Sequence, residues 1–199
     1  GTVMGLMAVL LPVLAILAAF CVNVAQMQLT RTELIVATDA AARAGGRAFS
    51  EVQTVEAAKT AAVTTAALNN VYGEPLLLQW DDGANEIEFG RTNQPNGSLG
   101  RYYFEKIPTS RVSSGEEVAS AVRVRGRRES GSLSGRVPLV IPGLLNANDF
   151  STVQVSVAMQ VDRDISLVLD RSGSMEEIEF EWPDGQSPWY TSTKNAGVN

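Results

Sequence analysis

The sequence contains no histidine and a single cysteine, Cys21. Without histidine the chain cannot build a Ser-His-Asp triad or a His-ligated zinc site, and one cysteine cannot form an intrachain disulfide. These absences remove most familiar enzyme classes. Basic residues are also scarce, since 16 Lys and Arg stand against 22 Asp and Glu for a net charge of −6. Duplex nucleic acid requires a concentrated basic face, so we expect no nucleic-acid partner.

Charge is absent from the beginning of the chain, because no charged side chain occurs before Arg31. Residues 3–22, VMGLMAVLLPVLAILAAFCV, form an uninterrupted apolar run. A helix rises about 1.5 Å per residue, so this run spans about 30 Å, the thickness of the hydrocarbon core of a bilayer. The run predicts a helix that lies in a membrane or in the core of a filament. The polar residues that follow predict an exit into water: Asn23, Gln26, Gln28, Thr30 and Arg31.

The apolar run differs from a signal peptide, whose apolar region usually holds about 7–15 residues and is removed from the mature chain. The sequence starts at Gly1 and no basic segment precedes the run, so we expect that an upstream segment has been cleaved or left out. Cleavage beside Gly1 would suit a prepilin-type leader. Pro12 removes one backbone hydrogen bond, which a helix tolerates where neighbouring helices pack around it.

Helical spacing of apolar residues continues beyond the run, now interrupted by charged residues. This pattern predicts an amphipathic extension of the first helix. The pair Gly45-Gly46 predicts a break or a kink in the extension. A second, alanine-rich helix is expected over residues 52–70, and the turn signal at residues 72–75 ends it.

After Pro75 the apolar period changes to two, which predicts antiparallel strands separated by turns. The expected strands are 76–80, 86–89, 102–107, 118–127, 136–141 and 152–161. In the last strand valines alternate with polar or small residues, so we expect the valine face to cover a core or the long helix. Arg123, Arg125 and Arg127 alternate with small or apolar residues. They indicate a solvent face that discourages strand addition, rather than a phosphate or anionic-lipid site.

The strongest chemical signal is the segment DISLVLDRSGSM at residues 164–175. Its apolar residues predict a buried strand over residues 165–169, which leads into a tight turn that carries Asp170, Ser172 and Ser174. One carboxylate and two hydroxyls at the C-terminal end of a strand are hard oxygen donors, which suit Mg²⁺ or Mn²⁺. We therefore predict that these three residues begin a metal site.

This segment resembles the opening of a von Willebrand factor A (VWA) domain, whose metal-ion-dependent adhesion site (MIDAS) begins with the same strand and Asp-x-Ser-x-Ser loop. In that family a Thr and an Asp from two later loops complete the metal site. Only Asp170, Ser172 and Ser174 carry over, and the sequence continues for 24 residues beyond Met175. The resemblance implies an incomplete site that holds Mg²⁺ weakly or not at all. Either the sequence is a fragment of a longer gene product, or the motif is a vestige of a VWA domain.

Three weaker signals lie in the middle and at the end of the sequence. Asp162 and Asp164 form a carboxylate pair of the kind that performs acid–base work, but a charged turn is the simpler interpretation. We expect no enzymatic activity and no small-molecule substrate. The acidic stretch at residues 176–184 does not match a twelve-residue calcium loop. Asn96-Gly97-Ser98 fits the N-glycosylation sequon, which has low specificity by itself.

Several features occur together: the processed-looking start, the apolar helix that runs into QMQL, the phrase ATDAAARAG at residues 37–45, a β-rich middle and DISLVLDRSGSM. Together they resemble the TadG-like and TadE-like proteins of tight-adherence (Tad) pilus systems, whose layout is related to that of type IV pilins and pseudopilins. The resemblance implies a bacterial envelope protein whose N-terminal helix lies in the inner membrane or in a filament core. Type IV pilins usually carry Glu at the fifth mature position, where this sequence has Gly5, or Leu6 if Thr2 comes first. This departure argues against a major-pilin role.

The predicted fold class is α+β. It combines a long N-terminal transmembrane or pilin-like helix, an antiparallel β-sheet module and the first strand of an incomplete VWA-type α/β domain. We expect a transmembrane or filament-core helix at residues 1–30 and an amphipathic helical extension at 31–74. A β-rich extracytoplasmic module follows at 75–162, and the VWA-like start with a surface tail occupies 163–199.

The predicted function is that of a non-enzymatic structural protein of the cell envelope. We expect a pilin-like subunit or membrane-anchored component of a Tad or type IV-like pilus, in the bacterial inner membrane or in an extracellular filament. Its partners would be the membrane or filament core around residues 3–22, and further copies or other pilin-like subunits. The alternative is a metal-dependent adhesin or ligand-binding module whose VWA domain is truncated here.

Overall fold

The computed structural model describes residues 2–80, 86–94 and 100–160. These residues form an α+β unit, as predicted, in which a long helix packs against a four-stranded antiparallel sheet. The helices are α1 (Thr2–Val52), α2 (Val55–Ala67), the short α3 (Thr109–Ser113) and the 3₁₀ helix η2 (Leu144–Asn146). The strands are β1 (Asn70–Val71), β2 (Glu74–Pro75), β3 (Ile87–Asn93), β4 (Tyr103–Ile107), β5 (Ala121–Arg128), β6 (Val137–Pro138), β7 (Asp149–Phe150) and β8 (Thr152–Met159). The VWA-like segment at 163–199 lies outside the described residues.

Helix α1 is a single helix of 51 residues, about 76 Å long at the usual rise per residue. It unites the apolar run with the amphipathic extension. The predicted break at Gly45-Gly46 is wrong, because the helix continues through both glycines. The chain breaks instead at Gln53, whose φ of 55° is left-handed. Thr54 then caps α2, since its side-chain oxygen accepts a hydrogen bond from the amide of Ala57.

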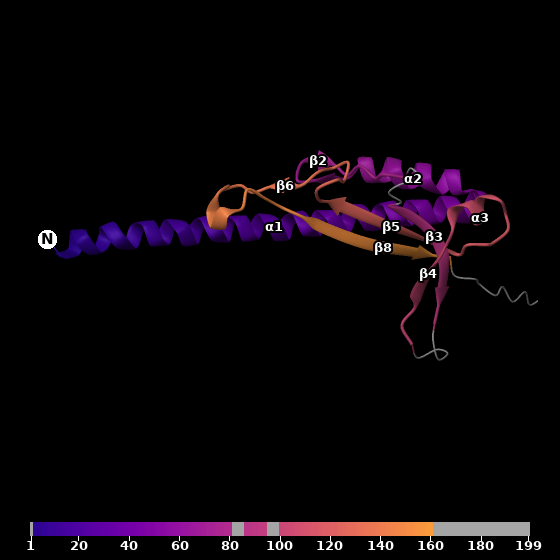
Figure 1. Cartoon of the computed structure of the whole chain (residues 1–199), viewed down its shortest axis with the longest axis horizontal. Coiled ribbons are helices and arrows are strands. Elements are labelled where there is room, and N and C mark those ends of the chain that lie inside the picture. Colours follow the sequence, from indigo (N-terminus) through magenta and orange to yellow (C-terminus); the bar gives the residue numbers. More distant parts are fainter. Residues whose placement is uncertain (1, 81–85, 95–99, 161–199) are drawn as a thin grey trace, which may run out of the picture. The chain divides into compact units, whose positions relative to one another are not determined.

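Helix α2 runs back along α1 because only two residues separate the helices (Figure 1). Most of the residues that α2 buries are alanines. Alanine side chains are short, so they let two helices approach closely without leaving a gap. The buried alanines are Ala37, Ala41 and Ala42 of α1, and Ala58, Ala62 and Ala66 of α2. The spacing of four along α2 places its three alanines on one face.

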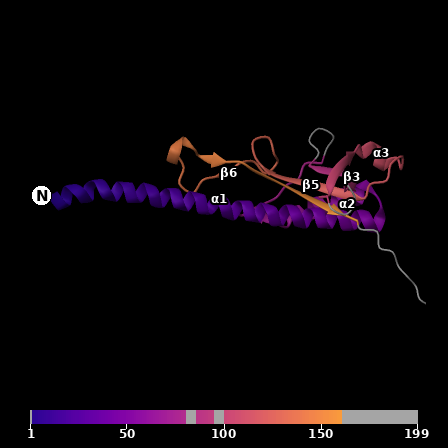
Figure 2. The ribbon, with the colours of Figure 1, turned by 90° about the horizontal axis from the view of Figure 1, so that it is seen from below.

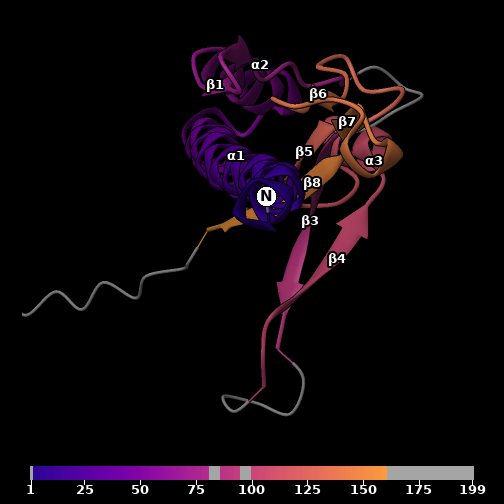
Figure 3. The same ribbon diagram turned by 90° about the vertical axis from the view of Figure 1, so that its left-hand side faces the viewer.

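The larger sheet has the strand order β4-β3-β5-β8, and each neighbouring pair is antiparallel. Helix α1 contacts β5 and β8 on one face of this sheet. The core lies beneath the helix, where Phe49 packs on Phe89 with their ring centroids 5.3 Å apart. Figure 3 looks along α1 and shows β5 and β8 beside the helix, while the β3–β4 hairpin extends away from both helices.

Strand β8 presents to α1 the face opposite to the predicted one. Its register pairs Ala158 with Val122 and Ser156 with Val124. The two valines of β5 are buried in the core, so Ser156 and Ala158 share the inner face. The valine and methionine row of β8 points outward and is largely exposed. The prediction that the valine face covers a core or the long helix is therefore wrong.

The predicted strand at residues 76–80 is also wrong, because this segment pairs with no strand of the described chain. Leu76 and Leu78 are buried alternately, as in a strand. However, the amide of Gln79 donates to the carboxylate of Glu86 over 2.6 Å instead of to a neighbouring strand. The other predicted strands are present with shifted ends, and the one at 136–141 shrinks to the two residues of β6.

Candidate functional site

The apolar half of α1 is uncovered within the described chain. Every side chain from Val3 to Ala18 is exposed, and the most apolar membrane-length window of the helix contains no buried residue. Figure 1 shows the N-terminal stretch of this half extending alone, while the orange turn that contains η2 (Leu144–Asn146) lies beside α1 further along the helix. By length and composition it could cross a membrane. So large an apolar surface is unfavourable in water, and we interpret it as a surface that lipid or another protein covers.

The sequence predicted that the polar side chains after the apolar run enter water, but not all of them do. Asn23, Gln26 and Thr30 are buried, so that prediction is wrong for these three residues. Asn23 and Gln26 are covered by a segment that we call the 137–150 hairpin. It consists of β6, β7, which pairs with β6, and the turn between them that contains η2.

Both amide side chains hydrogen-bond to the backbone of this hairpin. Asn23 Nδ2 donates to the carbonyl oxygen of Ile141 over 2.9 Å, and Asn23 Oδ1 accepts from the amide of the same residue over 3.0 Å. Gln26 Nε2 donates to the carbonyl oxygen of Pro138, and Gln26 Oε1 accepts from the amide of Val140, both over 2.8 Å. These four bonds satisfy the buried amides and fix the hairpin to α1 where the apolar run ends.

Two glycines allow the second half of α1 to lie close to the sheet. A Cβ atom added at Gly46 would lie 2.7 Å from Cβ of Ala158 in β8. One added at Gly126 in β5 would lie 2.1 Å from Oγ1 of Thr38 in α1. Both distances are shorter than van der Waals contact, so neither position has room for a side chain. The small residues of β8 face α1 for the same reason, and Ser156 Oγ donates to Asp39 Oδ1 over 3.0 Å.

The arginines of β5 do not form an anion site. Arg123 pairs with Glu88 and stacks on Phe104, with the guanidinium carbon 4.4 Å from the ring centroid. Lys106 Nζ lies 2.8 Å from the same glutamate. Burial raises the pKa of Glu88, but the hydrogen bonds from Lys106 and Arg123 outweigh burial and lower the pKa overall. Arg125 is exposed, whereas Arg123 and Arg127 are half-buried in ion pairs, so the predicted solvent face is present only in part.

A second carboxylate, Glu86, is buried beside β5. Its Oε1 lies 3.3 Å from Nε of Arg127, which also pairs with Glu129 over 2.9 Å. Burial raises the pKa of Glu86, opposed by the amide of Gln79 and by the charges of Arg127 and Arg125. The bonds of Glu86 go to the segment before β3 and to β5, which indicates a structural role.

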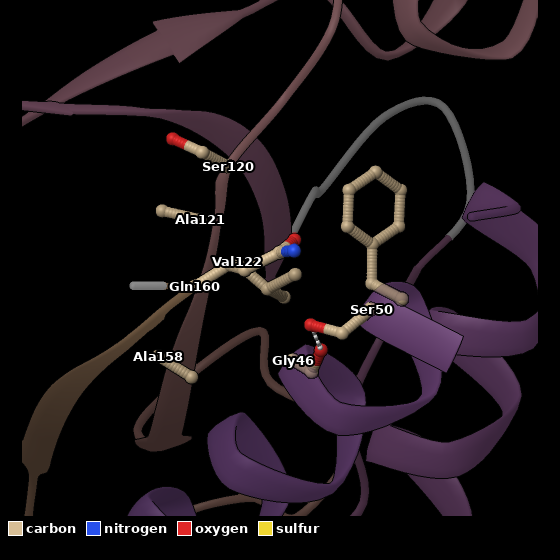
Figure 4. Close-up of a pocket in the computed structure, with 8 residues that line it drawn as sticks. Gly46, Ser50, Ser120, Ala121, Val122, Ala158 and Gln160 are labelled. Atoms are coloured by element: carbon tan, nitrogen blue, oxygen red, sulfur yellow. Dashed lines mark hydrogen bonds between the residues drawn. The ribbon is translucent and has the colours of Figure 1, made fainter. Parts of the chain in front are cut away.

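A small hollow lies between the end of α1 and strands β5 and β8 (Figure 4). The residues that line it are Gly46, Phe49, Ser50, Ser120, Ala121, Val122, Ala158 and Gln160. None of these side chains is charged, and Ser50 Oγ already donates to the carbonyl oxygen of Gly46 over 3.0 Å. The hollow therefore lacks a side chain suited to acid–base catalysis.

A shallow groove runs along the outer edge of β8. Its walls are the charged side of α1, where Arg43 Nη2 lies 2.7 Å from Asp39 Oδ2, and the exposed Val157 and Met159. Strand β8 is the last strand of its sheet, so its outward backbone groups form an unpaired edge within the described chain. This groove is the second exposed surface suited to a protein partner.

The predicted metal ligands Asp170, Ser172 and Ser174 lie outside the described residues, as do the pair Asp162 and Asp164 and the sequon at residues 96–98. Within residues 2–80, 86–94 and 100–160, no cluster of three or more Asp, Glu or Cys side chains is placed to hold a metal ion. The metal site thus remains a prediction from sequence.

Sequence reasoning missed the role of Asn23 and Gln26. A signal was available, because two amides three residues apart lie on the same side of a helix immediately after an apolar run. Their partners were not visible in the sequence. They are backbone groups more than 110 positions away, and peptide groups carry no residue-specific mark.

The first part of the chain resembles a known family. Residues 1–68 match the model of a family described as putative Flp pilus-assembly TadE/G-like. The matched range contains α1 and α2 and ends at Leu68, the C-terminal cap of α2. No curated protein and no solved structure matches the chain. The match supports a pilus-related component of the cell envelope.

Proposed function

We propose that this chain is a non-enzymatic structural component of a Tad or type IV-like pilus system, either a pilin-like subunit or a membrane-anchored assembly component. Residues 3–22 lie in the bacterial inner membrane or in a filament core, and the folded part lies outside the cytoplasm. The observation that carries this proposal is the division of α1. One half is apolar and exposed, while the other half is the central helix of the folded unit.

The packing of α1 supports a load-transmitting role for this helix. Its second half contacts α2, β5, β8 and the 137–150 hairpin without interruption. A force that a partner exerts on the apolar half is therefore transmitted directly to the folded unit. The pilus-assembly match covers the same helix.

The partners of the proposed component are further copies of this chain or other pilin-like subunits. Two surfaces are available for them. The apolar run of α1 suits helix packing in lipid or in a filament core, where small residues such as Gly5 and Ala8 permit close approach. The outer edge of β8 suits the addition of an extended segment.

The proposal is tested by following the full chain in native envelopes and in sheared filaments. We expect it to resist carbonate extraction from membranes or to enter the filament fraction. Oxidative cross-linking through Cys21, which is exposed on α1, is expected to yield a disulfide-linked dimer or a mixed disulfide with another subunit. The single cysteine fixes the position of the cross-link in this chain.

The Cys21→Ser variant is the matched control, because it removes the thiol and keeps the shape of the side chain. It should fractionate like the wild type and give no cross-link. The proposal fails if all three of the following results are found together. Carbonate releases the chain from the membrane, the filaments lack the chain, and the chain sizes as a strict monomer in detergent.

We also propose a second role, which rests on the sequence of residues 164–175. Asp170, Ser172 and Ser174 would supply oxygen ligands for Mg²⁺ in an adhesin or ligand-binding module of the VWA type. Such a site needs two further ligands from later loops. Calorimetric titration with Mg²⁺ alone tests the idea, since Asp170→Ala should abolish any binding and Asp162→Ala should not.

A further inference from the structure

We propose that the tip of the 137–150 hairpin inserts into the interfacial region of the lipid bilayer beside α1 and forms a second membrane contact of this chain. The occupant of this surface is lipid. The inference rests on the proposed function, because it requires that residues 3–22 of α1 span the membrane.

The hairpin has the composition of a membrane-contacting segment. Residues 137–148, VPLVIPGLLNAN, contain no charged side chain. The nearest charges are Arg136 and Asp149 at its base, where Arg136 Nη1 and Asp149 Oδ1 lie 3.0 Å apart. An uncharged tip above a paired, charged base is the distribution expected of a loop that leaves water at its tip.

Most backbone N–H groups of the hairpin are hydrogen-bonded, as an apolar medium requires. The amides of Val140 and Ile141 donate to Gln26 and Asn23. Four further amides donate within the hairpin: Leu139 to Asn148, Gly143 to Ala147, Asn146 to Gly143 and Ala147 to Leu144. Pro138 and Pro142 carry no N–H. Eight of the eleven residues from 138 to 148 therefore have no free amide.

The position of the hairpin along α1 matches the edge of the proposed span. Asn23, the first residue after the apolar run, bonds Ile141. From there the tip turns toward the N-terminus of α1, so that the turn containing η2 lies nearer to that end than β6 does, and Figures 1 and 2 agree on this. The apolar tip is thus continuous with the apolar surface of α1.

One arm of the hairpin carries an exposed apolar side chain next to the tip. The side chain of Val140 is 52% exposed, although its amide is held by Gln26. A valine whose backbone is fixed and whose side chain points outward cannot turn inward to reach the core. Together with the apolar run, it forms one surface that a bilayer can cover.

Fluorescence quenching tests this contact with the full chain in vesicles of three parts phosphatidylethanolamine to one part phosphatidylglycerol. Single cysteines are introduced into a Cys21→Ser background and labelled with an environment-sensitive dye. The test site is Val140→Cys. The matched control is Leu133→Cys, whose native side chain is 56% exposed in the turn after β5. Leu14→Cys reports on the span itself.

The label at position 140 is expected to be quenched by lipids that carry a nitroxide near the headgroup. It should also be quenched by aqueous iodide about fivefold less than the label at position 133. Equal access of iodide to positions 140 and 133 overturns the inference. Protection from iodide without quenching by nitroxide lipid also overturns it, because a protein partner then covers the hairpin.

The label at position 14 separates this inference from the proposed function. If iodide reaches position 14, α1 does not span the bilayer and the membrane-anchored form of the proposed function fails. If position 14 lies in lipid and position 140 lies in water, only the hairpin contact fails.

Discussion

The two halves of α1 belong to one helix but depend on different surroundings. The first half, up to Val22, is uncharged, and its side chains from Val3 to Ala18 are exposed in the described chain. The second half, from Asn23, carries charges, buried alanines and two close contacts with the sheet. An isolated helix gains little stability by itself, so the first half needs lipid or protein from outside, whereas the second half is stabilised by its own chain.

This difference shows where specificity lies in the molecule. Within this chain the first half requires only that its side chains be apolar, so substitutions among apolar residues there should leave the folded unit unchanged. The second half requires particular small residues at particular positions, because its neighbours lie too close for larger ones. Substitutions in each half can separate these two requirements.

The largest effect is expected from Leu11→Arg combined with Leu14→Arg in the first half. Each arginine costs about 3 kcal/mol near the centre of a membrane helix. We expect the double variant to be extracted by carbonate, with the near-UV circular dichroism of the folded unit unchanged. The Leu11→Ala and Leu14→Ala pair should stay in the membrane, and a double-arginine variant that also stays there would contradict the comparison.

The next largest effect is expected from Gly126→Ala in β5, where the added methyl group meets Thr38 at 2.1 Å. Forcing β5 and α1 apart should lower the free energy of unfolding by about 3 kcal/mol. Denaturant unfolding of the detergent-solubilised protein measures this change.

Two variants serve as controls for this clash. Adding Thr38→Ala should restore part of the lost stability, because it removes the nearest atom. Gly5→Ala, where nothing lies within 4 Å of the added atom, should leave stability unchanged or raise it slightly through helix propensity. Equal losses from Gly126→Ala and Gly5→Ala would show that packing is not the cause.

A smaller effect is expected from Asn23→Ala at the junction of the two halves. The variant leaves the part-buried N–H and C=O groups of Ile141 without their partner, at a cost of about 2 kcal/mol. Hydrogen exchange measured by mass spectrometry should show faster exchange in the 137–150 hairpin. Gln28→Ala removes an exposed amide of the same helix and should leave that exchange unchanged.

The smallest effect is expected from Glu86→Gln. Because burial raises the pKa of Glu86 in the folded state, the folded protein holds this proton more tightly than the unfolded chain does. The stabilising contribution of the proton is complete below the ordinary glutamate pKa of about 4.3 and is lost as pH rises through the folded pKa.

Urea unfolding of both proteins across this pH window measures the contribution. The stability of the wild type relative to Glu86→Gln should fall as pH rises and then level off. Glu88, whose pKa shifts in the opposite direction, is present in both proteins and cancels. A relative stability that increases with pH would refute the assignment.

Local pattern was sufficient to predict most elements of this fold. The absence of charge before Arg31 and the spacing of the alanines gave both long helices, and alternation gave β3, β4, β5 and β8 with shifted ends. These predictions succeed because helix and strand periodicities are properties of neighbouring residues. The apolar run, the first part of the candidate site, was predicted in the same way.

Three features of the site depended on distant residues and could not be predicted. Alternation in β8 shows that its faces differ but not which face meets α1, and the tight contact at Gly46 selects Ala158 over the valines. A glycine pair is ambiguous as well, because it suits a helix break or a close contact equally well. Asn23 and Gln26 appeared solvent-exposed because their partners lie on the 137–150 hairpin.

The sequence by itself determined that this chain has a membrane-length apolar helix, a second helix and an antiparallel sheet. The tertiary structure decided which surfaces remain free. It turned the valine row of β8 outward, continued α1 through Gly45 and Gly46 without a break and seated the 137–150 hairpin at the end of the apolar run. The physical reason is that burial is a property of pairs of surfaces, and the second surface of each pair lies far away in the chain.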